Sequence, residues 1–299
     1  MKLDPDLSGL ESESIHILRE TAADFEHPVL LYSVGKDSSV LLRLAERAFA
    51  PAPMPFPLLH IDTGFKFAEM LTFRNAAAVR AGARLIVHRN EAAIAAGANP
   101  FALGLGRCCS LLKTAALLDA LNQHGFTAAV GGARREEERS RAKERVFSRR
   151  DRNGAWDARR QRPELWALYN GRLAAGETMR VFPLSNWTEL DVWRYIGARR
   201  IPVVPLYFAA VREVLVRGRL LIPTEHDPPR QGGEQVRRVL CRMRTLGCTY
   251  CTGAIQSSAA SVSEIIHELQ VTDRSERENR LIDHGQEGGM EAKKLEGYF

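Results

Sequence analysis

One short stretch, residues 30–42, constrains most strongly what this chain can fold into. It reads Leu-Leu-Tyr-Ser-Val-Gly-Lys-Asp-Ser-Ser-Val-Leu-Leu, an apolar run that breaks at a polar turn and resumes with helical spacing. This order predicts a strand, a tight loop and a helix. Gly35 lets the backbone pass close to an anion, the following amides and helix N-terminus point at it, and Lys36 adds a positive charge. We therefore expect a nucleotide's phosphates to bind at Ser33, Gly35, Lys36, Asp37 and Ser38.

The spacing of apolar residues elsewhere predicts an α/β fold. Strands are expected over 29–32, 56–61, 84–88, 127–130 and 180–184, and helices over 11–25, 40–48, 67–81 and 111–121. A capping box at Thr188 and Asp191 predicts another helix. Strands that alternate with helices through short turns indicate a parallel, twisted sheet with helices on both faces.

Two further segments are expected to lack regular structure. Residues 90–106 predict an irregular connection, and the Pro-, Gly- and Arg-rich interval 223–233 predicts a linker or mobile loop. We therefore expect a nucleotide-binding domain over residues 1–200 and a smaller, irregular or helical C-terminal region over 201–299.

A polar turn, Asp62-Thr63-Gly64, follows the second expected strand. Open α/β sheets bind ligands at the carboxyl ends of their strands. This places Asp62, Thr63 and Gly64 where they would meet the nucleotide's sugar or a metal ion. The alternative is that Asp62 caps the helix expected to begin near Lys66.

A second turn, Gly131-Gly132-Ala133-Arg134-Arg135, follows the strand at 127–130. The glycines free backbone amides, and planar guanidinium groups suit phosphate or sulfate oxygens. Arg134 and Arg135 are therefore candidates to hold a second, anionic substrate. An exposed helix with ion pairs such as Glu137 to Arg141 is the alternative for the later part of this run.

The positive charge of the chain is concentrated in one segment. The formal net charge is +6, and residues 134–162 contain twelve Lys and Arg against six Asp and Glu, so the rest sums to about zero. Such a segment suits an anionic substrate or a polyanion such as DNA. For 145–162 we expect a solvated face or a subunit contact instead.

The start of the chain lacks the basic and then apolar order of a signal peptide, and no long apolar run indicates a membrane span. We therefore expect a cytoplasmic protein.

In a cytoplasmic chain, the five cysteines predict metal or cluster chemistry more than disulfides. Cys108 and Cys109 are adjacent, and Cys248 and Cys251 form a Cys-x-x-Cys pair. Four thiolates can hold an iron–sulfur cluster or a zinc ion, and plain buried cysteines remain an alternative. Cys241 is expected to be a packed residue.

Taken together, these motifs resemble those of the phosphoadenosine-phosphosulfate-reductase-like ATP pyrophosphatases, in particular the ATP sulfurylase small-subunit group. The likeness also covers 182–188, 274–277 and 293–299. It implies an adenine-nucleotide α-hydrolase-like fold that binds ATP and Mg²⁺ at one edge of the sheet. It further implies adenylyl transfer, in which an anion held by Arg134 and Arg135 attacks the α-phosphorus of ATP. Lys36 and Mg²⁺ would then stabilise the leaving pyrophosphate, with Asp37 or Asp62 near the metal.

The cysteine pattern resembles a different group of the same superfamily, the assimilatory adenylyl-sulfate reductases. That likeness implies a [4Fe–4S] cluster on Cys108, Cys109, Cys248 and Cys251. The nucleophilic cysteine that those reductases carry near the C-terminus has no counterpart beyond Cys251.

Three functional readings follow from the two likenesses. Iron–sulfur pyrophosphatases of DNA phosphorothioation systems work beside a cysteine desulfurase, so the favoured reading is activation of a DNA backbone phosphate. Sulfate adenylation as one subunit of an ATP sulfurylase is the alternative. The third reading is an ATP-sensing or scaffolding subunit without catalysis. The chain is expected to associate with no membrane, and it could form oligomers.

Overall fold

A six-stranded sheet forms the centre of the computed structural model, which describes residues 3–272, 275–278 and 280–284. Its strand order is β3-β2-β1-β4-β6-β5, and all neighbours are parallel except the pair β5 and β6. The strands are β1 (Pro28–Leu31), β2 (Leu58–Ile61), β3 (Leu85–His88), β4 (Ala128–Val130), β5 (Phe147–Arg150) and β6 (Thr178–Val181). The predicted α/β class is confirmed, although the antiparallel edge strand β5 was not foreseen.

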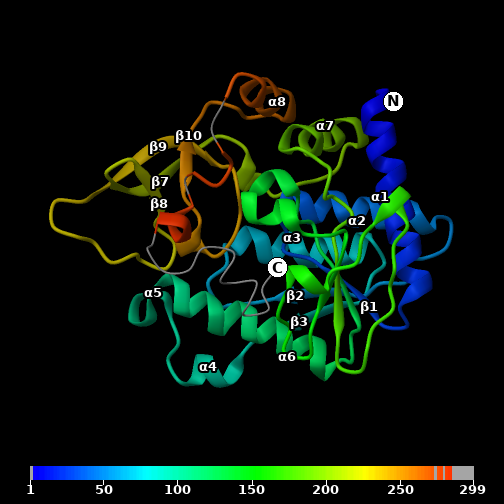
Figure 1. The fold of residues 1–299 in the computed structure, drawn as a ribbon. Helices are drawn as coiled ribbons and strands as arrows, with labels where there is room; N and C mark the ends of the chain where they lie inside the picture. The colour runs from blue at the N-terminus through cyan, green and yellow to red at the C-terminus, as the bar shows by residue number, and fades with distance from the viewer. Residues whose placement is uncertain (1–2, 273–274, 279, 285–299) are drawn as a thin grey trace.

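Helices cover both faces of this sheet (Figure 1). Side chains on a strand alternate between the two faces, so neighbouring residues of β1 enter different cores. Leu30 packs in the larger core beside α2, whereas Val29 and Leu31 pack against α6. The helices are α1 (Pro5–Asp24), α2 (Lys36–Phe49), α3 (Ala68–Arg80), α4 (Glu91–Ala95), α5 (Pro100–Cys109), α6 (Ala116–Gln123), α7 (Glu189–Arg199) and α8 (Val262–Gln270).

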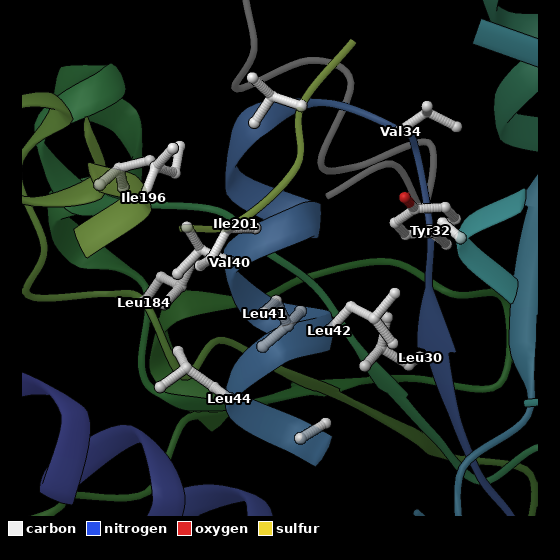
Figure 2. Close-up of a cluster of buried hydrophobic side chains, with 14 of the residues drawn as sticks. Leu30, Tyr32, Val34, Val40, Leu41, Leu42, Leu44, Leu184, Ile196 and Ile201 are labelled. Carbon is white, nitrogen blue, oxygen red and sulfur yellow. The ribbon is translucent and has the colours of Figure 1, made fainter. Parts of the chain in front are cut away.

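The junction between β1 and α2 is fixed by this larger core. Figure 2 shows Val40, Leu41 and Leu44 along α2, with Leu30 on the strand beside them. All four side chains are fully or almost fully buried. The loop between the strand and the helix is therefore held from both sides by packed apolar residues.

The C-terminal region differs from the irregular or helical region that was predicted. Four antiparallel strands close into a small barrel, with the order β10-β8-β7-β9. They are β7 (Ala210–Arg217), β8 (Leu220–Pro223), β9 (Gln235–Met243) and β10 (Ala254–Gln256). Charged residues occupy so many positions of β7 and β9 that apolar alternation, the usual sign of a strand, is obscured. Residues 224–234 connect β8 to β9, so the loop predicted there is confirmed.

The segment 90–106 was predicted to be irregular, and this is wrong. It contains α4 and most of α5, which begins at Pro100 with the Asn99 side chain accepting from the amides of Phe101 and Ala102. An Asn-Pro start is favourable for a helix, but Gly104 and Gly106 weaken the pattern, and Gly104 leaves the helical conformation with φ 74°.

The helical stretch Pro100–Gln123 continues through a π-helical turn, Ser110–Ala115, into α6. By length and composition alone this stretch could cross a membrane. Its α6 part packs on the sheet through Leu117, Ala120 and Leu121, as a core helix does.

Candidate active site

The expected phosphate loop lies between β1 and the first turn of α2. Gly35 is the N-cap of α2, and Lys36 is its first helical residue. The Lys36 amide donates a hydrogen bond to the Tyr207 hydroxyl at 2.7 Å, so a residue from the C-terminal half of the chain caps this helix. The left-handed conformation in this loop belongs to buried Val34, with φ 70°, whereas Gly35 has φ −72°. Glycine at position 35 is thus not needed for backbone freedom.

A network of buried charges surrounds this helix start. The Lys36 Nζ lies 2.6 Å from the Glu276 carboxylate and 3.2 Å from that of Asp37. Arg134 donates to Asp37 at 2.7 Å and to Glu136 at 2.8 Å, and it also pairs with Glu276. Lys36, Arg134 and Glu276 are each less than one-tenth exposed. The network joins the end of β1, the turn after β4 and the C-terminal segment.

These contacts keep the network ionised. Burial lowers the pKa of Lys36 and of Arg134, but the charges of Asp37 and Glu276 outweigh it and hold both pKa values above their usual range. Burial likewise raises the pKa of Asp37 and of Glu276, but the charges of Lys36 and Arg134 outweigh it and lower both. Two cations and two carboxylates are therefore charged at neutral pH.

A cavity of about 190 Å³ opens over the loop. All five predicted phosphate-loop residues line it, namely Ser33, Gly35, Lys36, Asp37 and Ser38. The turn 131–133 after β4, Lys113, Glu137 and Arg141 line other sides, and Glu276, Arg277 and Arg280 close it from the C-terminal segment. The loop and the first turn after β4 are therefore brought together as the sequence suggested.

Gly132 fixes how closely these two turns approach. A Cβ built at this position would lie 3.2 Å from the carbonyl carbon and Cβ of Asp37 and 3.3 Å from the Ser38 amide nitrogen. These contacts are tighter than ordinary van der Waals packing. Glycine is required here because the backbone after β4 lies directly against the phosphate loop.

The two arginines predicted to bind a second substrate do not act as a pair. Arg134 is enclosed by carboxylates, whereas Arg135 pairs with Asn186 and lies near the Glu144 carbonyl. Neither Arg134 nor Arg135 is among the residues that line the cavity. Glu136, in the 3₁₀ turn Arg135–Glu137, pairs with Arg134, so the two neighbouring guanidinium groups have different partners.

The side chain of Asp62 interacts mainly with the backbone of its own turn. The Asp62 carboxylate accepts from the Gly64 amide at 2.9 Å, and α3 begins later, with Phe67 as its N-cap, so Asp62 does not cap that helix. Thr63 Oγ1 lies 3.1 Å from Cys248 Sγ. Asp62, Thr63 and Gly64 lie at the end of the strand beside β1 but do not line the cavity.

The basic segment 145–162 is partly solvated, as predicted, with Arg145, Arg152, Arg159 and Arg160 exposed. Arg150, on β5, is instead fully buried and pairs with Glu144. Arg149 and Arg160 both reach Glu177. Much of the local positive charge is therefore neutralised by ion pairs within the chain.

The two cysteine pairs, far apart in sequence, come together. Cys251 forms a hydrogen bond with Cys248 that lowers the pKa of Cys248. The same hydrogen bond, burial and the charges of Cys248 and Cys109 raise the pKa of Cys251. Burial, followed by the charges of Cys248 and Cys109, raises the pKa of Cys108 to about 12. Among the described residues, however, no three His, Cys, Asp or Glu side chains form a metal-binding group.

Lys113 and Cys241 show how the cysteines lie relative to the cavity and the core. Lys113 acts electrostatically on Cys248 and also lines the cavity, so the cysteines lie next to the candidate active site. Cys241 is fully buried on β9, as predicted for a packed residue.

Three site residues were not assigned by sequence reasoning. Glu276 lies in the segment 274–277 that the family likeness covers, but it was given no role, and Tyr207 and Lys113 lie outside the motifs that were identified. They reach the site through long-range packing, which no local spacing reports.

A charged loop at the carboxyl edge of a parallel sheet, with helices on both faces, defines a nucleotide-binding α/β protein. Residues 27–254 match the phosphoadenosine phosphosulfate reductase domain, and the chain belongs to this family. Trp187 and Trp193 are both buried in the core of the chain.

Similar proteins agree with this assignment. The chain is 62% identical over 296 residues to sulfate adenylyltransferase subunit 2 of Myxococcus xanthus (strain DK1622), covering 98% of this chain and 96% of that protein. It is 56% identical over 294 residues to sulfate adenylyltransferase subunit 2 of Aeromonas salmonicida (strain A449), covering 98% and 95%. The chain is accordingly an adenylyltransferase-type enzyme.

A solved structure supports the fold. The FMN adenylyltransferase of Candida glabrata in complex with ATP is 16% identical with a TM-score of 0.51, covering 94% of this chain and 91% of that one. The predicted adenine-nucleotide α-hydrolase-like fold is confirmed.

Proposed function

We propose that this chain transfers the adenylyl group of ATP to sulfate, as the ATP-binding subunit of a sulfate adenylyltransferase. The observation that carries the proposal is the buried cationic pair Lys36 and Arg134 at the phosphate loop. Near-complete alignment with sulfate adenylyltransferase subunits supports sulfate as the acceptor. The sequence alone favoured a DNA phosphate, and the comparisons favour the alternative.

In the proposed reaction a sulfate oxygen attacks the α-phosphorus of ATP, and the bond from that phosphorus to the bridging oxygen of pyrophosphate breaks. Lys36 and the start of α2 would stabilise the negative charge on the leaving pyrophosphate. No residue needs to act as a covalent nucleophile, because positioning and electrostatics supply the catalysis.

Mg²⁺ fits the oxygen donors at the cavity. Asp37 carries a carboxylate at the first turn of α2, and Mg²⁺ binds nucleotide phosphates with one or two protein carboxylates. Asp37 would hold the ion, and the ion would neutralise phosphate charge. Asp62 is a weaker candidate, because it does not line the cavity.

A DNA backbone phosphate remains the second acceptor to be tested. The four neighbouring cysteines favour it, because sulfur handling would give them a purpose and a cysteine desulfurase would then supply sulfur. The basic segment argues for it less strongly than the sequence suggested, since Arg134, Arg141 and Arg150 are buried inside the chain.

The discriminating experiment supplies ATP and Mg²⁺ with either sulfate or duplex DNA and measures pyrophosphate release and adenylyl sulfate formation. The sulfate arm is repeated with the large GTP-binding subunit that the resemblance implies. We expect adenylyl sulfate to form in the sulfate arm. Pyrophosphate release with DNA, and none with sulfate in either form of the assay, would contradict the proposal.

We further propose that Cys108, Cys109, Cys248 and Cys251 hold a [4Fe–4S] cluster, with zinc as the alternative. Support comes from the donor set, four sulfur atoms from two distant segments that interact electrostatically, although no three of these side chains form a metal-binding group in the described part of the chain. A bound cluster would supply a charged sulfur centre beside Lys113 and the cavity.

The cluster is tested by anaerobic purification with iron, sulfide and zinc analysis. We expect brown protein that loses its iron in Cys248→Ala, because one of four ligands is missing. Cys241→Ala is the matched control and should keep its iron, since Cys241 is buried elsewhere on β9. Colourless, zinc-loaded protein would reject the cluster.

A further inference from the structure

Glu276 occupies the place where an anionic ligand would meet the two buried cations. Its two carboxylate oxygens divide between them, with one 2.6 Å from Lys36 Nζ and the other paired with Arg134. The side chain is almost completely buried, and it reaches these partners across 240 and 142 residues of sequence. A carboxylate with two oxygens on two cations imitates the way a phosphate group would bind them.

The cavity over the loop is small for a nucleotide. Its volume of about 190 Å³ lies below the roughly 300 Å³ at which ligand pockets usually begin. Glu276, Arg277 and Arg280 form one of its walls. A triphosphate seated on the loop would therefore compete with Glu276 for space as well as for charge.

An exchange of Glu276 for a phosphate group would leave both buried cations with an anionic partner. Lys36 and Arg134 face the carboxylates of Asp37 and Glu276, and Arg134 also pairs with Glu136, so both cations are fully compensated without a ligand. Burying both cations without these partners would be costly. A phosphate group that replaced Glu276 would again give both cations an anionic partner, and the carboxylate could then move into water.

We propose that Glu276 is a positioning residue that keeps Lys36 and Arg134 aimed at the phosphate loop in the empty site, and that its turn, residues 275–278, withdraws when the phosphates of ATP bind. The proposal builds on ATP binding in the proposed function and adds the exchange of one anion for another. It also explains why Arg134 is buried although an incoming anion must reach it.

The test measures the binding of MgATP, and separately of inorganic pyrophosphate, to the full-length protein by calorimetry without sulfate. Glu276→Gln removes the competing charge but keeps the size of the side chain. We expect both ligands to bind about five- to tenfold more tightly than to the wild type. Glu26→Gln, an exposed glutamate just before β1 that does not line the cavity, is the matched control and should leave both affinities unchanged.

Unchanged binding by Glu276→Gln would overturn the proposal, because Glu276 would then not compete with the ligand. Weaker binding would also overturn it, because Glu276 would then be a supporting ligand of the nucleotide or its metal. Failure of the wild type to bind ATP at all would instead overturn the proposed function. This test measures binding without sulfate, so its result does not depend on whether the protein turns over sulfate.

Hydrogen–deuterium exchange gives a second readout on the wild type, in case Glu276→Gln does not fold. The Glu278 amide donates to the Ser275 carbonyl at 3.2 Å, so withdrawal of the turn should expose it. We expect faster exchange at 275–278 when MgATP is added. Slower or unchanged exchange would contradict withdrawal.

Discussion

Lys36 is the residue on which the proposed chemistry depends most. Its ammonium group is held by Asp37 and Glu276 at the start of α2, where a leaving pyrophosphate would develop charge. Lys36→Ala should reduce pyrophosphate release by at least about 100-fold. Arg134 still pairs with both carboxylates, so the circular dichroism spectrum should remain that of the wild type.

The control for this variant is Arg219→Ala, which removes an exposed cation between β7 and β8. It should release pyrophosphate at the wild-type rate. A folded Lys36→Ala protein with undiminished turnover would remove Lys36 from the mechanism.

Gly132 gives a prediction about packing at the same loop. In Gly132→Ala the new methyl group would meet the backbone and Cβ of Asp37 at 3.2 Å, so one of the two turns must shift. We expect the free energy of unfolding to fall by about 1–3 kcal/mol and ATP to bind more weakly. Urea denaturation and calorimetry measure the two effects.

Gly9→Ala is the matched control. Gly9 lies exposed in α1, and a Cβ there would meet nothing within 4 Å. Alanine in a helix interior should raise the free energy of unfolding by about 0.5–1 kcal/mol and leave ATP binding unchanged. Equal effects of the two variants would show that the turns do not depend on Gly132.

At the scale of elements, α1 packs into the main core, and one of its carboxylates links it to both α2 and α7. Glu11 accepts from the Tyr195 hydroxyl at 2.7 Å and pairs with Arg199 and Arg47. Burial raises the pKa of Glu11, but the hydrogen bonds from Tyr195 and Arg199 and the charge of Arg47 outweigh it and lower the pKa below its usual value.

This shift makes the attachment depend on pH. Because the folded pKa lies below the unfolded one, the stabilisation is complete above the unfolded value of about 4.3 and is lost as the pH falls through the folded value. Glu11→Gln should therefore lower the free energy of unfolding by about 1–3 kcal/mol at pH 7 and by less at acid pH. Urea denaturation at both pH values measures this, and an equal difference at both would refute it.

The elements that the sequence predicted best are those with a strong local period. The run from Leu30 to Leu44 predicts β1, the loop and α2 correctly, and the capping box at Thr188 is present at the start of α7. The barrel was missed because Arg and Glu side chains interrupt the apolar pattern of β7 and β9. Its closure depends on pairing among four strands, which no single stretch reveals.

At the scale of the whole molecule, the candidate site combines one segment that sequence identifies with several that it does not. The phosphate loop is recognisable because its residues are contiguous. Tyr207 and Glu276 come from positions 171 and 240 residues away from Lys36, and only the folded chain brings them to it. The cysteine pairs were recognised as two halves, but their meeting depended on the same long-range packing.

The most direct test of the account is a structure of the protein with Mg²⁺ and a non-hydrolysable ATP analogue. We predict that the β- and γ-phosphates lie on residues 33–38 within hydrogen-bonding distance of Lys36 Nζ, and that Glu276 no longer contacts Lys36. A triphosphate bound elsewhere, with Glu276 still paired to Lys36 and Arg134, would contradict the account.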